Sequence, residues 1–192
     1  MKIMVIVDMQ NDFVTGPLGS SEAQAIVPKI VDKLEQANGS EYLVLFTKDT
    51  HQSDYMDTQE GKNLPVPHCI EGTSGWSIVK PIASYVDYSG KFLTYSAKDI
   101  IKGRFYKPTF GSLELAAELR KICELPDVDV EEIIFMGVCT DICVVSNVLM
   151  TKAYCPEVLV TVDAECCAGV TPDRHVAALE TMKSCQVNVI ND

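Results

Sequence analysis

The stretch EIIFMGVCTDICVVSNVLMTKA, residues 132–153, joins a short apolar run directly to a segment of helical length. An almost uninterrupted apolar run of this length is typical of a strand that is covered on both faces. We therefore expect a strand over Glu132–Val138 and a helix over Asp141–Ala153. A strand that leads into a helix in this way is the unit from which parallel α/β sheets are built.

The same unit recurs on both sides of this stretch, and alternation of this kind predicts a parallel sheet with helices on both faces. We predict one domain over residues 1–192, an α/β fold of three layers around a central, mainly parallel sheet of about six strands. The other expected elements are strands at Lys2–Val7, Tyr42–Thr47, Val158–Val162 and Val187–Ile190, a strand within 84–107 that ends near Lys107, and helices at 21–37, at Ser112–Cys123 and from about Thr171-Pro172.

Composition and charge exclude several classes of protein. The chain has 16 basic and 27 acidic residues, and a net charge of −11 repels nucleic-acid phosphates and anionic lipids. No apolar run approaches the roughly 18 residues that span a bilayer, and Asp8 comes too early for a signal-peptide core. The 8 cysteines are scattered, with no other sign of secretion. We expect a cytoplasmic protein with mostly reduced cysteines that binds neither nucleic acid nor membranes.

Three chemically useful side chains stand where predicted strands end, which is where open parallel sheets bind ligands. Asp8 follows the first strand, Lys107 ends the middle strand, and Cys143 lies in the first turn of the helix after residue 138. A helix N-terminus and a nearby lysine both favour a thiolate. A carboxylate can accept the thiol proton and then deliver it to a leaving amine. The trio predicts amide hydrolysis through a thioester.

Cys139 is the alternative nucleophile in the same segment. If Thr140 or Asp141 caps the helix, Cys143 lies inside the first turn and Cys139 lies outside it, so we favour Cys143. Backbone N–H groups near Cys139 and Cys143 would then form an oxyanion hole. We interpret His175, far along in the last helix, as a surface histidine without a role.

A metal site is predicted in and beside the long segment 50–75, which is rich in Gly, Pro, Ser, Thr and Asp and is expected to form an active-site wall. Asp49 and His51 present two side chains to one cation, and His68 follows in the same segment. Carboxylate and imidazole together suit zinc, iron or manganese, whereas ordinary hydrogen bonding within the loop is the alternative. The candidates for a fourth ligand are Glu60, which we prefer because it precedes His68, and Asp54, Asp57 and Cys69.

Five ordered blocks of the sequence resemble those of the bacterial nicotinamidases, within the isochorismatase-like hydrolases. The blocks are VDMQNDF at 7–13, TKDTH at 47–51, PHCIEGTSGW at 67–76, FYKPTFGS at 105–112 and GVCTDICV at 137–144. The resemblance implies that Asp8 accepts and donates the proton, that Lys107 gives electrostatic support, and that Cys143 is the nucleophile. It also implies a non-proline cis peptide before Cys139, which shapes the oxyanion hole.

The same resemblance implies a substrate pocket around the metal. Asp49, His51 and His68 would hold the ion, which would bind the pyridine nitrogen of nicotinamide. Phe13 resembles the aromatic residue that lines the substrate ring, and Trp76 would help to close the pocket.

One departure from the family pattern concerns the fourth ligand. Many members carry a third histidine shortly after the D-x-H, where this chain reads QSDYMD at 52–57. Some members use a glutamate before the last histidine instead, and Glu60 fits that variant. The departure places the fourth ligand, and through it the substrate, in question.

The expected function is the hydrolysis of nicotinamide to nicotinate and ammonia by a metal-dependent homo-oligomer. The nearest alternative is a relative that hydrolyses an N-carbamoyl or ureido compound, although such relatives generally lack the D-x-H and the second histidine. The vinyl-ether hydrolases of the superfamily normally lack the cysteine. A third hypothesis is a non-catalytic module, or a thiol redox module that uses Cys139 and Cys143.

Overall fold

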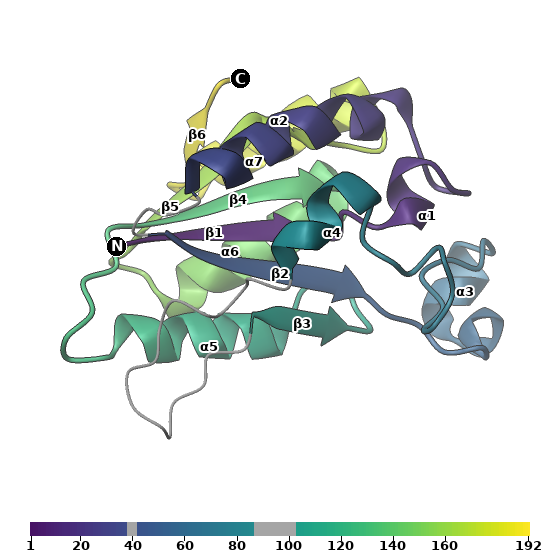
Figure 1. Ribbon diagram of the computed structural model, residues 1–192, viewed down its shortest axis with the longest axis horizontal. Helices are drawn as coiled ribbons and strands as arrows, with labels where there is room; N and C mark the ends of the chain where they lie inside the picture. Colours follow the sequence, from purple (N-terminus) through teal and green to yellow (C-terminus); the bar gives the residue numbers. More distant parts are fainter. Residues whose placement is uncertain (38–41, 87–102) are drawn as a thin grey trace.

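A computed structural model describes residues 1–37, 42–86 and 103–192, and these residues contain one six-stranded sheet in which every pair of neighbours is parallel (Figure 1). The strand order is β3-β2-β1-β4-β5-β6. The predicted three-layer α/β fold is therefore confirmed. The strands are β1 (Lys2–Val7), β2 (Tyr42–Asp49), β3 (Arg104–Lys107), β4 (Glu132–Val138), β5 (Leu159–Ala168) and β6 (Asn188–Ile190).

The helices follow the path of the chain through the sheet. The chain runs outward from β1 to β3, returns to β4 and continues outward to β6. Right-handed crossovers place the helices of these two halves on opposite faces, and Figure 1 shows α2 and α5 on opposite sides of the sheet. The helices and helical turns are α1 (Asn11–Val14), α2 (Ser21–Ala37), the 3₁₀ turn η1 (Tyr55–Asp57), α3 (Gln59–Asn63), α4 (Lys80–Val86), α5 (Leu113–Cys123), the π-helical turn η2 (Thr140–Val144), α6 (Val145–Tyr154) and α7 (Pro172–Ser184).

The site lies where the strand order reverses, between β1 and β4. Strand β1 occupies the middle of the sheet, and its residues Ile3–Val7 are buried, which explains the continuous apolar run in the sequence. After β1 the chain continues toward one edge of the sheet, and after β4 it continues toward the other edge. The carboxyl ends of two such strands leave a crevice between them. Asp8 leaves β1 at this crevice with a positive φ of 49°, a conformation that is rare outside glycine and is concentrated at functional sites.

Two strands are longer than the sequence predicts. β2 continues past Thr47 through Lys48 and Asp49, because these polar residues pair with Tyr106 and Lys107 at the end of β3. The predicted end at Thr47 was wrong for this reason. The strand expected to end near Lys107 is confirmed as β3, whereas the part of the 84–107 prediction that falls on 87–102 lies outside the described residues.

β5 extends to Ala168 instead of ending at Val162. Its polar residue Asp163 is buried beside Lys33 of α2, with a carboxylate-to-ammonium distance of 2.8 Å. Pairing with β4 resumes after an irregularity, with Gly137 opposite Cys167. A buried ion pair thus allows the strand to continue through residues that look like a strand end in the sequence.

Segment 50–75 is not a plain loop, because it contains η1 and α3, which the sequence analysis did not predict. Thr58 caps α3 by accepting a hydrogen bond from the N–H of Gly61. Among the described residues, no helix combines the length and the apolarity that crossing a bilayer requires.

Gly137 of β4 is a position where even a single added methyl group is expected to disturb the scaffold of the site. Its φ is +124°, and a Cβ at this position would lie 2.1 Å from the backbone oxygen of Val7. We expect Gly137→Ala to lower the free energy of unfolding by about 3 kcal/mol or more, because both the backbone conformation and the contact are unfavourable. Urea denaturation followed by circular dichroism measures this change.

Gly72→Ala is the matched control for this prediction. Gly72 also has a positive φ, +82°, but nothing lies within 4 Å of the position that a Cβ would occupy. The expected loss is about 1 kcal/mol, from backbone conformation alone. Equal losses in the two variants would contradict the role assigned to the contact between Gly137 and Val7.

Candidate active site

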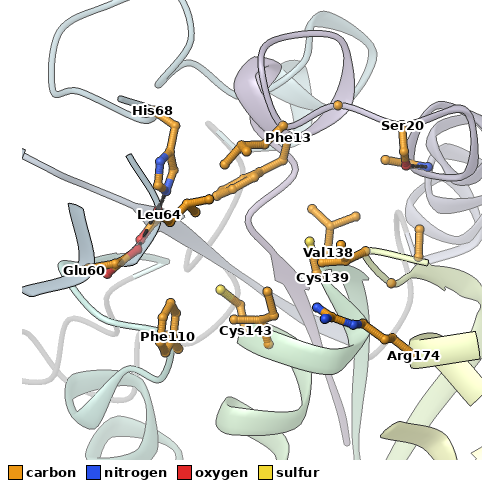
Figure 2. Close-up of a pocket in the computed structure, with 18 residues that line it drawn as sticks. Phe13, Ser20, Glu60, Leu64, His68, Phe110, Val138, Cys139, Cys143 and Arg174 are labelled. Carbon is orange, nitrogen blue, oxygen red and sulfur yellow. Dashed lines mark hydrogen bonds and ion pairs between the residues drawn. The ribbon is translucent and has the colours of Figure 1, made fainter. Parts of the chain in front are cut away.

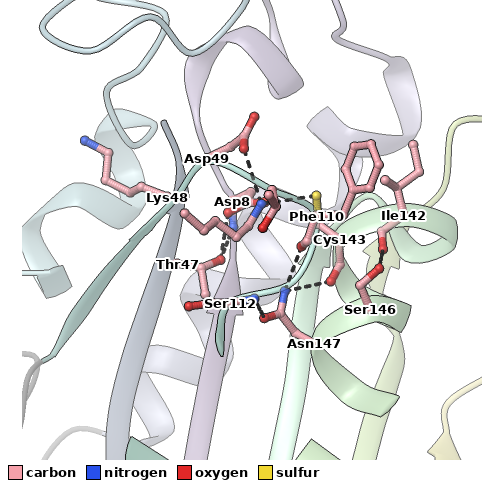
Figure 3. Close-up of polar contacts among 12 residues, drawn as sticks. Asp8, Thr47, Lys48, Asp49, Phe110, Ser112, Ile142, Cys143, Ser146 and Asn147 are labelled. Atoms are coloured by element: carbon pink, nitrogen blue, oxygen red, sulfur yellow. Dashed lines mark hydrogen bonds and ion pairs between the residues drawn. The ribbon is translucent and has the colours of Figure 1, made fainter. Parts of the chain in front are cut away.

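Asp8, Lys107 and Cys143 come from three separate strand ends and meet in the crevice. The Lys107 Nζ lies 2.7 Å from Asp8 Oδ2 and donates a hydrogen bond of 3.3 Å to Cys143 Sγ. The three side chains are 0%, 1% and 6% exposed, respectively. Figure 3 shows Asp8 and Cys143 approaching each other at this point. The structure therefore brings together the carboxylate, ammonium and sulfur that the sequence analysis placed in one cleft.

Thr47 fixes the orientation of the Asp8 carboxylate. The Thr47 hydroxyl donates to Asp8 Oδ1 at 2.7 Å, and the Thr47 hydroxyl oxygen accepts a hydrogen bond from the backbone N–H of Asp8 at 3.2 Å. Thr47 was not identified as a site residue from the sequence. The parallel register between β1 and β2 explains the contact. It pairs Ile6 with Phe46, so Thr47, the next residue of β2, lies beside the end of β1.

Burial and charge set the proton affinities of the trio. Burial raises the pKa of Asp8, against the opposing charge of Lys107. Burial lowers the pKa of Lys107, but the charges of Asp8, Cys143 and Asp49 outweigh it, and the pKa is raised well above its usual value. Burial raises the pKa of the Cys143 thiol, with Lys107 opposing. A raised thiol pKa favours the protonated sulfur, which agrees with the expectation that a carboxylate accepts the thiol proton.

The backbone around Cys143 differs from the predicted helix start. Residues Thr140–Val144 form the π-helical turn η2, and α6 begins only at Val145. Cys139 is the residue before η2, and neither Thr140 nor Asp141 caps α6, so that part of the prediction was wrong. The peptide between Val138 and Cys139 is cis, as predicted.

The structure distinguishes the two cysteines by their contacts. Cys143 is hydrogen-bonded to Lys107 through its sulfur, and its carbonyl oxygen accepts a hydrogen bond of 2.8 Å from the side chain of Asn147. The Cys139 side chain is half-buried and lines the cavity described below. Cys143 is thus the thiol that contacts the ammonium, in line with the preference drawn from the sequence.

A second cluster lies next to the trio and is joined to it by Asp49. The Lys107 Nζ lies 3.4 Å from Asp49 Oδ1, while Asp49 Oδ2 faces two imidazoles, 3.0 Å from His51 Nε2 and 3.3 Å from His68 Nε2. Glu60 Oε1 approaches the same two nitrogens at 3.7 and 3.8 Å. Three of the four residues proposed from the sequence as metal ligands, Asp49, His51 and His68, therefore converge, and Glu60 lies beside the two histidines at a slightly longer distance.

The histidines of this cluster are oriented as metal ligands. His68 Nδ1 lies 2.8 Å from the carbonyl oxygen of Val66, which fixes the proton on Nδ1 and leaves the lone pair of Nε2 directed into the cluster. His51 Nε2 is buried and, within the described ranges, has no aligned hydrogen-bond partner. One ligand atom each from Asp49, His51 and His68 lies within 4.8 Å of the others. These donors fit a divalent cation of the zinc, iron or manganese type.

Electrostatics keep Asp49 ionised in this cluster. Burial raises the pKa of Asp49, but the close contacts with His51 and His68 and the charge of Lys107 outweigh burial, and the net pKa lies well below the usual range. Glu60 differs, because burial and the charge of Asp49 raise its pKa. An anionic Asp49 is the form that ligates a cation.

Gln10 holds Asp49 in place and was not identified from the sequence. Its amide side chain accepts the backbone N–H of Asp49 at 2.7 Å and donates to the carbonyl oxygens of Asp49 and Trp76, both at 2.9 Å. Gln10 is fully buried. Its position two residues after Asp8, within the block VDMQNDF, is the feature of the sequence that could have pointed to a place near the site.

A cavity of about 400 Å³ opens over both groups of residues. Cys143 and Cys139 form its floor, Glu60 and His68 enter from one side, and Phe13 lies above them (Figure 2). The ring of Phe13 is 5.4 Å from that of His68, between centroids. Segment 50–75 contributes Glu60, Leu64 and His68 to the lining, so it forms a wall of this cavity.

Trp76 lies elsewhere, and its predicted role in closing the pocket was wrong. It does not line this cavity, and its indole N–H donates to the hydroxyl of Thr50 at 2.9 Å. The Lys48 ammonium sits 3.0 Å from the centre of the Trp76 ring, and Tyr106 stacks on the same indole. Burial lowers the pKa of Lys48 to about 8. Trp76 therefore packs over the Lys48 side chain at the edge of the sheet, where its ring contacts the ammonium group.

His175 is not the surface histidine that the sequence suggested. It is half-buried, and its Nδ1 lies 2.8 Å from the hydroxyl of Thr140 in η2. Burial lowers the pKa of His175, which favours the neutral ring. The residue links α7 to the turn that carries the candidate nucleophile.

Comparisons with known proteins show which family this chain resembles over its length. The family model described as Isochorismatase domain matches residues 2–191. A nicotinamidase/pyrazinamidase of Mycobacterium tuberculosis is 29% identical over 203 residues, which cover 99% of this chain and 98% of that protein.

Solved structures extend the comparison to the fold. The crystal structure of nicotinamidase/pyrazinamidase from Bacillus subtilis has a TM-score of 0.75 and 25% identity, with 98% of each chain covered. The structure of a Pyrococcus horikoshii pyrazinamidase in complex with zinc shares the fold, with a TM-score of 0.72, 21% identity, and coverage of 100% of this chain and 99% of that one. With the family model matching almost the whole length, this chain belongs to the isochorismatase domain family.

Proposed function

We propose that this protein is an amidohydrolase that cleaves nicotinamide to nicotinate and ammonia through a thioester on Cys143. The observation that carries the proposal is that Lys107 contacts both Asp8 and Cys143 and also Asp49, a member of the imidazole and carboxylate cluster. One cavity thus joins an acyl-transfer centre to donors suited to a divalent ion. The names of the relatives in Mycobacterium tuberculosis and Bacillus subtilis support nicotinamide as the substrate.

Asp8 is the proposed proton carrier. It contacts the Cys143 thiol, and its raised pKa makes it a stronger base than an exposed aspartate. Asp8 accepts the thiol proton as the sulfur attacks the amide carbon, and then delivers that proton to the leaving nitrogen. Lys107 stabilises the negative charge that moves between the carboxylate and the sulfur. Water then cleaves the thioester, and Asp8 accepts its proton in turn.

The oxyanion hole is proposed at the backbone N–H groups of Cys139 and Cys143. Such donors act where charge develops on the carbonyl oxygen in the tetrahedral intermediate. The turn η2 between these residues is held by hydrogen bonds from the N–H groups of Ile142 and Val144 to the carbonyl oxygen of Cys139, both 3.0 Å long. The turn is therefore a rigid support for the proposed donors.

Asp49, His51, His68 and Glu60 are the proposed ligands of a zinc, iron or manganese ion. A divalent ion held there offers a Lewis-acid site to the lone pair of a ring nitrogen. Phe13 is proposed to pack against the substrate ring, because it lies beside His68 on the cavity wall. A pyridine ring bound between these groups presents its carboxamide toward Cys143.

The experiment that tests this proposal compares amide substrates with the purified protein. We expect release of equimolar ammonia and nicotinate from nicotinamide, measured by a coupled ammonia assay and by chromatography. Benzamide has the same shape without the ring nitrogen, and its kcat/KM is expected to be ~100-fold lower, because a site built to bind a polar atom rejects an analogue that lacks it. N-carbamoylglycine tests the nearest alternative. Turnover of N-carbamoylglycine without turnover of nicotinamide would replace the proposal.

The proposal also covers the domain organisation, the location, the oligomeric state and the partners of the protein. We propose that residues 1–192 act as one catalytic domain, that the protein works in the cytoplasm, and that it forms a homo-oligomer. Its partner is a small amide and not a nucleic acid or a membrane, which fits the net charge of −11. Size-exclusion chromatography with light scattering measures the oligomeric state directly.

A further inference from the structure

Arg174 lies at the end of the cavity opposite the metal-ligand cluster. It belongs to the first turn of α7, and its side chain lines the cavity that Cys139 and Cys143 also line. Figure 2 shows the guanidinium extending from α7 toward Cys139, whereas Glu60 and His68 enter from the other side. The Cys143 sulfur thus lies between a cluster of carboxylates and imidazoles and a guanidinium.

The segment that carries Arg174 is tied to η2, the turn that carries the proposed nucleophile. The backbone N–H of Val170 donates to Asp141 Oδ1 at 2.9 Å, and His175 Nδ1 lies 2.8 Å from the hydroxyl of Thr140. These two contacts stand on either side of Arg174 in the sequence. The distance between its backbone and the nucleophile is therefore set by specific hydrogen bonds.

The guanidinium of Arg174 has no acidic partner among the described residues. Arg174 is an exposed residue, so solvent as well as the cavity reaches its side chain. The two carboxylates that line the cavity, Asp49 and Glu60, belong to the proposed metal cluster. Among the other lining residues are the small or apolar Leu18, Ala23, Ala168, Gly169 and Val170 and the hydroxyl-bearing Ser20, none of which carries a charge. This end of the cavity is therefore complementary to an anionic group on a ligand.

The geometry points to Arg174 as a specificity-determining residue that binds a carboxylate on the leaving-group side of the substrate. The inference rests on the proposed function, which assigns the heteroaromatic acyl group to the cluster end. With the ring there and the carbonyl carbon at Cys143, the amide nitrogen and its substituent extend into the remaining end of the cavity. A guanidinium binds a carboxylate through two parallel charge-assisted hydrogen bonds. The substrate class is the N-heteroaroyl amino acids, secondary amides whose amine carries a carboxylate.

The reaction uses the same groups as primary-amide hydrolysis. The Cys143 sulfur forms a bond to the carbonyl carbon, the C–N bond breaks, and the thiol proton passes through Asp8 to the nitrogen, so that a free amino acid leaves. Water then forms the new C–O bond and the C–S bond breaks, which restores the thiol. One water is consumed, and one heteroaromatic carboxylate and one amino acid are released.

The test compares nicotinoylglycine with N-ethylnicotinamide, a neutral secondary amide of similar length, in the wild type and in Arg174→Ala. We expect the wild type to prefer nicotinoylglycine, and we expect the ratio of the two kcat/KM values to fall about tenfold in Arg174→Ala, mainly through KM. Arg174→Lys should retain part of the preference, because it keeps the charge without the planar fork. Arg120→Ala is the matched control, since Arg120 is an exposed arginine on α5 that pairs with Glu124.

The remaining outcomes separate this inference from the proposed function. If the ratio of the two kcat/KM values is unchanged in Arg174→Ala, the carboxylate subsite is overturned. A parallel fall of both kcat/KM values leaves this ratio unchanged, and it would mean that Arg174 acts on the oxyanion or on folding instead. Turnover of nicotinamide by the wild type without turnover of either secondary amide would overturn the subsite and leave the proposed function standing. Absence of nicotinamide turnover would overturn the proposed function itself.

Discussion

Replacement of Cys143 by alanine is expected to lower kcat for nicotinamide hydrolysis by ~10⁴-fold or more, because no covalent intermediate can form without the sulfur. Cys143 is the cysteine whose sulfur is hydrogen-bonded to Lys107, and it is only 6% exposed, so the change also removes a buried contact and the folding of the variant has to be checked. The measurement is a single-turnover and steady-state ammonia assay, with circular dichroism to establish that the variant is folded.

Cys139→Ala is the matched control, because Cys139 lines the same cavity and stands four residues earlier. It is expected to change kcat less than tenfold, since its proposed contribution is a backbone N–H that alanine retains. Mass spectrometry of the acid-quenched enzyme should find the acyl group on position 143. Reversed effects of the two substitutions would make Cys139 the nucleophile.

Asp8→Asn tests the base in the same series. The amide keeps the shape of the carboxylate and its contact with Thr47 but cannot accept the thiol proton. Proton transfer by a positioned side chain contributes ~10²–10⁴-fold, and a loss in this range is expected. Alkylation of Cys143 by iodoacetamide should slow in parallel. An active Asp8→Asn variant would remove Asp8 from the mechanism.

His51→Ala is expected to remove the metal and most of the activity. Loss of a ligand should weaken metal affinity by ~100-fold or more, so that the purified variant contains much less than one ion per chain. His51 is the best position for this test, because Asp49 also contacts Lys107 and its replacement would disturb the trio as well. Inductively coupled plasma mass spectrometry measures the metal, and the ammonia assay measures turnover.

His175→Ala provides the control for the metal prediction, since His175 contacts Thr140 and lies outside the cluster. It should keep the full metal content. Glu60→Gln examines the fourth ligand, and an intermediate loss of metal is expected from the distances of 3.7 and 3.8 Å to the two imidazoles. Dialysis against a chelator followed by separate additions of zinc, iron and manganese identifies the ion. Full metal content and activity in His51→Ala would refute the proposed site.

Most of the fold follows from local pattern, and the errors have physical causes. Buried strands such as Lys2–Val7 are recognisable because both faces are covered, so that the apolar run is continuous. The ends of β2 and β5 were misplaced because Lys48, Asp49 and Asp163 are polar residues whose partners lie on other elements. The π-helical turn at Thr140–Val144 was also missed, since its spacing of polar and apolar residues is compatible with an ordinary helix.

The sequence by itself determined the α/β class and the residue types at or just after the strand ends, namely Asp8, Lys107 and Cys143. These properties depend on neighbours along the chain. Only the tertiary structure decided that burial raises the pKa of Cys143, that Glu60 approaches the histidines, and that Arg174 lines the cavity whereas Trp76 does not. Burial, distance and the direction of a side chain are set by elements far apart in sequence, and no local pattern encodes them.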